Sequence, residues 1–162
     1  MHLVSALAAW LSQTTFSAWL GEQTWVLPTI QSIHILAVAV VMICMIIVNL
    51  RVLGFSLIQQ SLPQAFSRFL LPAWCGLCVL LLTGLIMIIG EPQRELANTV
   101  FWVKMLLIVV AVLSSLGLAR VVGRSGADMP RKKRLLASTV AVSLLLIWPA
   151  ILACGRWIAY TQ

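Results

Sequence analysis

Four long runs of apolar residues dominate the chain, and short polar segments separate them. They extend approximately over Trp25–Leu50, Phe69–Gly90, Val100–Val122 and Leu135–Cys154. A helix needs about 20 predominantly apolar residues to cross the hydrocarbon of a bilayer, and each run reaches that length. Lipid offers no partner for free backbone N–H and C=O groups, so each run is predicted to be a helix. Pro72 is expected in the first turn of the second helix, where a missing N–H costs little.

The segment that precedes the first run, residues 1–20, is less apolar and is interrupted by the polar residues 12–15. Its larger apolar side chains share one helical face: Leu3, Leu7, Trp10 and Leu11. Tryptophan favours the membrane–water interface. We therefore expect an interfacial helix over residues 1–20, lying in the plane of the outer membrane surface, with a fifth span as the alternative. No Lys or Arg precedes the apolar part, so a signal peptide is not expected.

The composition agrees with a membrane protein, because 62% of the residues are apolar, 9% are charged and the mean hydropathy is +1.06. Soluble domains are usually about 45–50% apolar and roughly 25% charged. We predict an all-α fold, an integral membrane four-helix bundle that forms a single transmembrane domain over residues 1–162. The spans leave no room for a separate catalytic domain. No Ser/His/Asp triad or phosphate-binding Gly-rich loop is present, so hydrolase and NTPase functions are not favoured.

The eleven Lys and Arg residues are distributed unevenly between the predicted spans, and only four Asp and Glu oppose them. Eight lie around the first and third connections: Arg51, Arg68, Arg120, Arg124, Arg131, Lys132, Lys133 and Arg134. Three lie on the other side: Arg94, Lys104 and Arg156. The positive-inside rule then predicts a bacterial cytoplasmic membrane protein with these two loops in the cytoplasm and both termini outside. Anionic lipid, rather than nucleic acid, is the expected partner of the basic run 131–134.

Two ionisable residues lie inside the predicted spans, where such groups cost roughly 2.5–3.5 kcal/mol on insertion scales. His34 is about 13 Å along the helix axis from Trp25, and Lys104 is about 6 Å from Val100. Both are therefore expected in the outer half of the membrane. His34 is a candidate metal ligand through one ring nitrogen. The alternative is an interhelical hydrogen bond to Thr, Ser or a backbone carbonyl.

Other polar and soft side chains leave several interpretations open. Lys104 can extend to the head groups, neutralise a carboxylate or ligate a metal. Arg156 can anchor the interface or hold an anionic group such as a propionate. Cys75 and Cys78 form a C-x-x-C, but the chain has only two histidines to complete a zinc site, so small-residue packing is favoured.

Methionines and glycines add two further expectations. Met42 or Met45 together with His34 would suit Cu(I), which makes copper handling an alternative function. The glycines of the second span give it close-packing surface, which is compatible with a homo-oligomer: Gly76, Gly84 and Gly90.

Several short motifs carry a resemblance to known proteins. They are Gln31–Ala37, Asn49–Arg51, Thr83–Leu85, Phe101–Lys104 and Gly155–Tyr160. Together they resemble an uncharacterised bacterial family of small four-helix membrane proteins. More distantly, the first two motifs and the fourth resemble the copper-resistance D-type membrane domains and the HemJ-type protoporphyrinogen oxidases, which bind haem b. The second resemblance implies His34 and Lys104 as cofactor-binding residues, and also Arg51.

These features give the leading hypothesis, an integral membrane protein that holds b-type haem between the first and third spans and transfers electrons. His34 would be the axial ligand of the haem iron. Lys104 would be a second ligand, a propionate partner or a proton donor, in that order of preference. Quinone or an extracytoplasmic electron donor would be the redox partner, and the activity would be that of a haem-dependent membrane oxidoreductase. Copper handling and a structural or assembly subunit without cofactor are the alternatives.

Overall fold

A computed structural model describes residues 2–55, 61–125, 130–158 and 160 of the chain. These residues form helices and, within those ranges, no strand. Four of the helices are long: α3 (Val26–Val52), α4 (Leu62–Gly90), α6 (Thr99–Ser125) and α7 (Arg131–Ile158). All four are long and apolar enough to cross a membrane, which confirms the all-α class and the four runs predicted from hydropathy.

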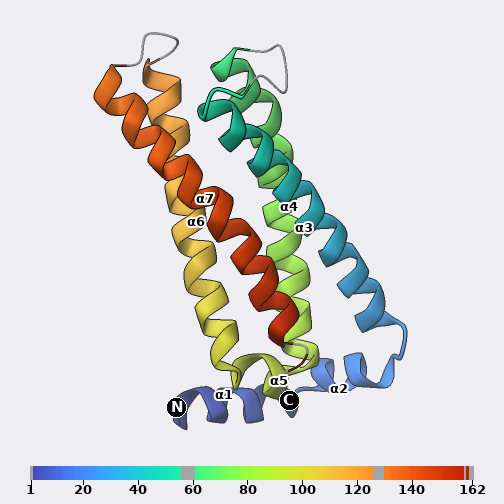
Figure 1. Ribbon diagram of the computed structural model, residues 1–162. Coiled ribbons are helices and arrows are strands. Elements are labelled where there is room, and N and C mark those ends of the chain that lie inside the picture. The colour runs from blue at the N-terminus through green and yellow to red at the C-terminus, as the bar shows by residue number, and fades with distance from the viewer. Residues whose placement is uncertain (1, 56–60, 126–129, 159, 161–162) are drawn as a thin grey trace.

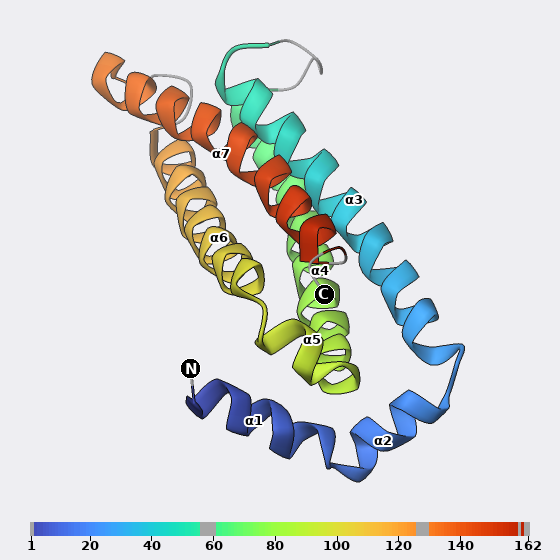
Figure 2. The same cartoon turned by 60° about the horizontal axis from the view of Figure 1, so that its bottom comes forward.

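The four long helices lie side by side as two antiparallel pairs (Figure 1). α3 packs mainly against α4, α6 packs mainly against α7, and α7 also contacts α3. The connections between α3 and α4 and between α6 and α7 lie at the same end, which we call the loop end (Figures 1 and 2). The opposite end carries the short helix α5 (Pro92–Leu96) and is called the α5 end.

The N-terminal segment forms two short helices, α1 (His2–Ser12) and α2 (Thr15–Glu22), in place of the single helix expected over residues 1–20. The break falls at the polar interruption, where the backbone N–H of Ser17 donates to Thr14 Oγ1 at 3.3 Å and caps α2. Both helices run across the α5 end beneath the long helices (Figures 1 and 2). On the expected apolar face of α1, Leu7 and Trp10 are exposed, and the Leu3 side chain lies outside the described residues.

Helix α4 begins at Leu62, seven residues before the predicted span. Ser61 and Gln64 form a capping box, in which the Ser61 N–H donates to Gln64 Oε1 at 3.0 Å. The hydropathy pattern missed this start because the first two turns carry polar residues. The expectation for Pro72 was therefore wrong, since this proline lies in the helix interior rather than in the first turn.

Among the residues that the structure describes, the buried apolar side chains form two separate clusters. The larger one involves all four long helices: Val41, Cys44, Met45, Val48, Phe66, Ala73, Ala111, Leu118, Val122, Ala137, Ala141, Leu144 and Trp148. The smaller one lies at the α5 end: Ala8, Leu96, Phe101 and Ile158. Large apolar side chains also cover the outside of the long helices, such as Leu36, Leu106 and Leu146. An apolar exterior of this kind suits lipid rather than water.

The glycines of α4 are used for packing within the chain. A Cβ at Gly76 would lie 2.7 Å from Val41 Cγ2, and one at Gly90 would lie 2.7 Å from Leu27 Cδ2. A Cβ at Gly84 would meet His34. All three glycines therefore face α3 of the same chain.

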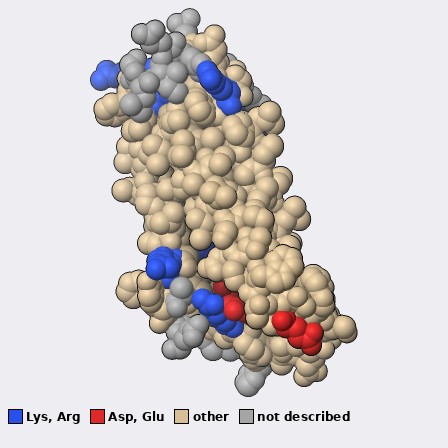
Figure 3. All heavy atoms as spheres, turned by 90° about the vertical axis from the view of Figure 1, so that its right-hand side faces the viewer, with Lys and Arg blue, Asp and Glu red and all other residues tan. Residues whose placement is uncertain are grey.

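Charged side chains gather at the two ends of the molecule and leave an uncharged band between them on the face shown in Figure 3. On that face Lys and Arg appear at the loop end, and both signs of charge appear at the α5 end. The acidic residues that the structure describes are Glu22, Glu91 and Glu95, and all of them belong to the α5 end.

Candidate functional site

His34 on α3 is half-buried and contacts α4 through a hydrogen bond between its Nδ1 and Thr83 Oγ1, 2.7 Å apart. The Thr83 hydroxyl has a single proton, and the backbone oxygen of Val79 is a second partner at 2.7 Å from Thr83 Oγ1. When the hydroxyl donates to Val79, Thr83 Oγ1 accepts the bond from His34 and the ring proton lies on Nδ1. In the neutral imidazole this leaves Nε2 as the unprotonated nitrogen, and Nε2 has no hydrogen-bond partner within the described parts of the chain.

Gly84, the residue after Thr83, shapes the surroundings of the ring. A Cβ built on Gly84 would lie 3.7 Å from His34 Cε1, an ordinary van der Waals distance, and would meet nothing else within 4 Å. The glycine therefore leaves a methyl-sized space beside the imidazole. Thr83 and Gly84 fall between the two apolar clusters along α4, so the buried apolar packing is interrupted at this level.

Lys104 lies on α6, in the same half of the molecule as His34 and within electrostatic range of its ring. Its stem packs against α7, because Lys104 Cδ would lie 3.9 Å from a Cβ on Gly155. Its ammonium is 5.6 Å from the ring centroid of Phe101, one turn nearer the α5 end. No hydrogen bond or ion pair to this ammonium is found among the residues described.

Arg156 follows Gly155 and is exposed at the α5 end of α7. Its Nη2 donates to the Tyr160 hydroxyl at 2.8 Å, and the guanidinium carbon is 5.0 Å from the Tyr160 ring centroid. The carboxylate of Glu91 pairs with Arg94 at 2.6 Å. Lys104 therefore contacts the position of Gly155, Arg156 follows this glycine in sequence, and neither cation forms an ion pair with a described carboxylate.

Three of the four residues that the sequence predicted as cofactor-binding thus lie in the half of the molecule at the α5 end: His34, Lys104 and Arg156. Arg51 does not join them, since it lies at the loop end, about 26 Å from His34 along the axis of α3. Thr83, Gly84 and Gly155 complete the group. Thr83 and Gly155 had no predicted role, and Gly84 was expected only to provide close packing. The signal for Gly155 was its position next to Arg156.

The arrangement offers few ligands for a bare metal ion. Within the described ranges no three His, Cys, Asp or Glu side chains come together. Met42 and Met45 lie about 12 and 17 Å from His34 along α3, so the soft ligands expected for Cu(I) are not gathered at its imidazole. Cys75 and Cys78 are both exposed on α4, and Cys44 is buried in the larger apolar cluster. What the site provides is one imidazole nitrogen, a small gap beside the ring and two nearby cations.

Comparison with known proteins gives a family without an assigned activity. No curated protein matches the chain, and no solved structure matches it. The model of a family of unknown function, DUF6644, matches residues 7–161. The match includes all four long helices and every residue of the site. The chain belongs to this family of unknown function, DUF6644.

Proposed function

We propose that this chain is an integral membrane protein that binds b-type haem between α3 and α6 and takes part in electron transfer, with His34 as an axial ligand. The hydrogen bond between His34 and Thr83 carries the proposal, because it holds the imidazole ring and, with Nδ1 as the donor to Thr83, leaves the lone pair on Nε2. Histidines that ligate metals usually donate their other ring N–H to a nearby acceptor, which fixes the tautomer and the ring orientation.

A porphyrin suits this site better than a bare ion does. Haem brings four nitrogen ligands of its own and needs only one or two from the protein. A single imidazole with no further donor cluster among the described residues meets that requirement. Copper held by one imidazole would lack the ligands that a stable site needs.

Lys104 and Arg156 are assigned to the propionates. Haem carries two carboxylates, and charge-assisted hydrogen bonds from ammonium and guanidinium groups suit them. Because the Lys104 ammonium lies over Phe101, toward the α5 end, the geometry supports a propionate partner in preference to a second axial ligand. When bound, haem would supply a one-electron carrier whose potential the chain tunes through ligation, burial and hydrogen bonding.

The proposed placement puts the chain in the bacterial cytoplasmic membrane with the loop end in the cytoplasm, since the basic residues concentrate there. Exposed aromatic side chains support an interfacial position for α1 and α2 at the α5 end: Trp10, Trp19, Trp25, Trp102 and Trp157. The four long helices would then form the membrane bundle. Quinone or an extracytoplasmic donor would exchange electrons at the α5 end, as in a haem-dependent oxidoreductase.

A second candidate is a structural or assembly subunit without cofactor. The observation that favours it is the same His34–Thr83 bond, which by itself joins α3 to α4.

Haem content separates the two candidates. The full chain is purified in detergent from cells supplied with haem, and haem per chain is measured as the pyridine haemochrome, with copper measured on the same sample. We expect about one haem per chain, lost in His34→Ala and kept in Gln31→Ala, an exposed polar neighbour on α3. A folded wild-type chain without haem would overturn the proposal, leaving copper handling if copper is found and a structural role if it is not.

A further inference from the structure

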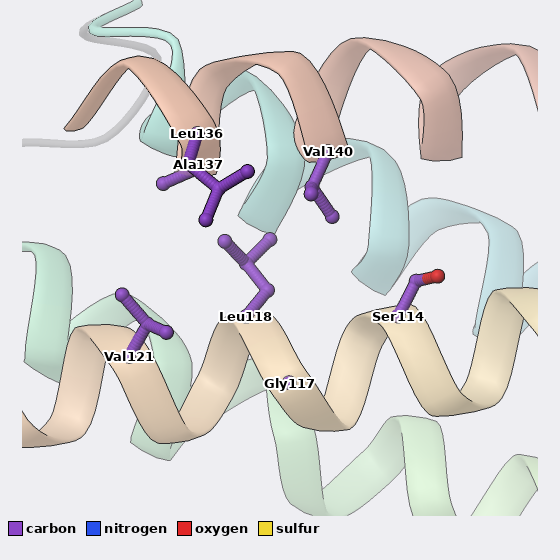
Figure 4. A pocket seen from close by; sticks show the side chains of 7 residues that line it. All are labelled: Ser114, Gly117, Leu118, Val121, Leu136, Ala137 and Val140. Carbon is purple, nitrogen blue, oxygen red and sulfur yellow. The ribbon is translucent and has the colours of Figure 1, made fainter. Parts of the chain in front are cut away.

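A groove lies between α6 and α7 in the half of the molecule nearest the loop end (Figure 4). Its volume is about 240 Å³, and its lining is almost entirely apolar: Ser114, Gly117, Leu118, Val121, Leu136, Ala137 and Val140. Leu118 and Ala137 are buried at its base, whereas Leu136 is 62% exposed at its rim. The groove is therefore an opening on the side of the α6–α7 pair rather than a closed cavity.

Gly117 helps to keep the groove open. A Cβ on Gly117 would meet no heavy atom within 4 Å, so the space beside this glycine is not filled by the chain itself. The groove extends over about two helical turns, or roughly 10 Å, which suits a segment of an extended hydrocarbon chain.

Two basic residues are close in sequence to residues that line the groove, on the side of the loop end. Lys133 precedes Ala137 by one turn and shares its helical face, and Arg120 follows Gly117 by three residues along α6. Both are exposed. The described acidic residues all lie at the α5 end, so none of them competes for these cations. An apolar slot that opens toward cations is complementary to a lipid with an anionic head group.

We propose that this groove binds one acyl chain of an anionic phospholipid from the leaflet at the loop end, while Lys133 and Arg120 contact its phosphate. The lipid would cover Leu136 and fill the space beside Gly117. The inference depends on the long helices spanning a membrane and is independent of haem, since the groove lies in the half opposite the His34 site.

Native mass spectrometry of the full chain in detergent tests the proposal, with equal amounts of phosphatidylglycerol and phosphatidylcholine as probes. We expect the wild type to retain phosphatidylglycerol preferentially. Gly117→Leu should lose bound lipid of both kinds. Lys133→Gln should lower the preference for phosphatidylglycerol about fivefold, since one basic residue at a membrane surface contributes about that factor.

Two matched variants serve as controls. Gly123→Leu adds the same side chain to α6 where a Cβ also meets nothing within 4 Å, but about 120° around the helix from Gly117. Arg131→Gln removes a charge from the opposite side of α7 to Lys133. Both should bind lipid as the wild type does.

Equal retention of the two lipids by the wild type, or equal lipid binding by Gly117→Leu and Gly123→Leu, would overturn the proposal. Dimers that disappear in Gly117→Leu, in place of lipid adducts, would assign the groove to a second copy of the chain instead.

Discussion

Nδ1 of His34 on α3 is hydrogen-bonded to the Thr83 hydroxyl on α4, 2.7 Å away. The Thr83 hydroxyl also lies 2.7 Å from the backbone oxygen of Val79, and donation to that oxygen makes Nδ1 the donor of the interhelical bond. The bond connects the two helices, and with this direction it leaves Nε2 as the ring nitrogen that can bind a metal. These two consequences lead to different predictions.

Replacing Thr83 by valine removes the acceptor and keeps the shape of the side chain. An interhelical hydrogen bond in a membrane protein contributes about 0.6–1 kcal/mol, so we expect a decrease of that size in the free energy of unfolding in detergent. If His34 ligates haem, loss of the group that orients its ring should also weaken haem binding about tenfold or more. Thr83→Ser, which retains the hydroxyl, is the control for haem titrations. Equal haem affinity in the two variants would show that the bond has only a packing role.

The glycines of α4 should differ in their tolerance of a methyl group. Gly76→Ala would bring Cβ to 2.7 Å from Val41 Cγ2, and the branched valine has little rotamer freedom with which to move away. We expect a loss of about 1–3 kcal/mol in the free energy of unfolding, as for other overpacked sites. Gly84→Ala, with its nearest neighbour at 3.7 Å, should be close to neutral. Denaturation by sodium dodecyl sulfate, followed by circular dichroism, compares the two, and equal stability would contradict the described packing of α3 on α4.

Substitutions at Lys104 distinguish a charge interaction with a haem propionate from ligation of the haem iron. If Lys104 pairs with a propionate, Lys104→Met should leave the shape of the haem absorption bands unchanged. Removal of a nearby positive charge should make reduction less favourable by on the order of 1 kcal/mol, which lowers the midpoint potential. Lys104→Arg should keep the wild-type potential in a redox titration. Band shapes that change in both variants would identify Lys104 as an axial ligand instead.

Cysteines introduced one at a time test the orientation of the chain in the membrane. Gln13→Cys lies at the exposed junction of α1 and α2, and Lys132→Cys lies at the loop end. A membrane-impermeant maleimide added to intact cells should label the first variant, and it should label the second only after permeabilisation. The wild-type chain is the control, because its four cysteines all lie in the long helices and should remain unlabelled. The reverse pattern would place the loop end outside and contradict the assignment from charge.

Hydropathy predicted all four long helices, but it predicted the first residue closely only for α3 and α6. The start of α3 was placed within one residue, because its apolar run begins at the helix start. α4 and α7 both begin earlier than predicted, at Leu62 and Arg131, since their first turns are polar. A hydropathy window detects the apolar part of such a helix, whereas capping and helix propensity set its first residue.

The sequence predicted only some residues of the candidate site. His34 and Lys104 stood out because ionisable groups are rare in apolar helices. Thr83, Gly84 and Gly155 did not, because threonine and glycine are common in membrane helices. In addition, α3 is apolar on its outer face as well as its inner face, so periodicity could not indicate which side would meet α4. Only the three-dimensional structure therefore shows that these residues lie in the same half of the molecule.

The most direct test of the central claim is chemical rescue at His34. Membranes containing His34→Gly are compared by absorption spectroscopy, oxidised and reduced, with and without added imidazole. If Nε2 of His34 ligates haem iron, the variant should lose the Soret and reduced bands of the wild type, and imidazole should restore them by occupying the vacated space. Gln31→Gly should behave as the wild type throughout. A haem spectrum in His34→Gly that is already identical to the wild type without imidazole would contradict the assignment, and so would a wild-type chain with no haem bands at all.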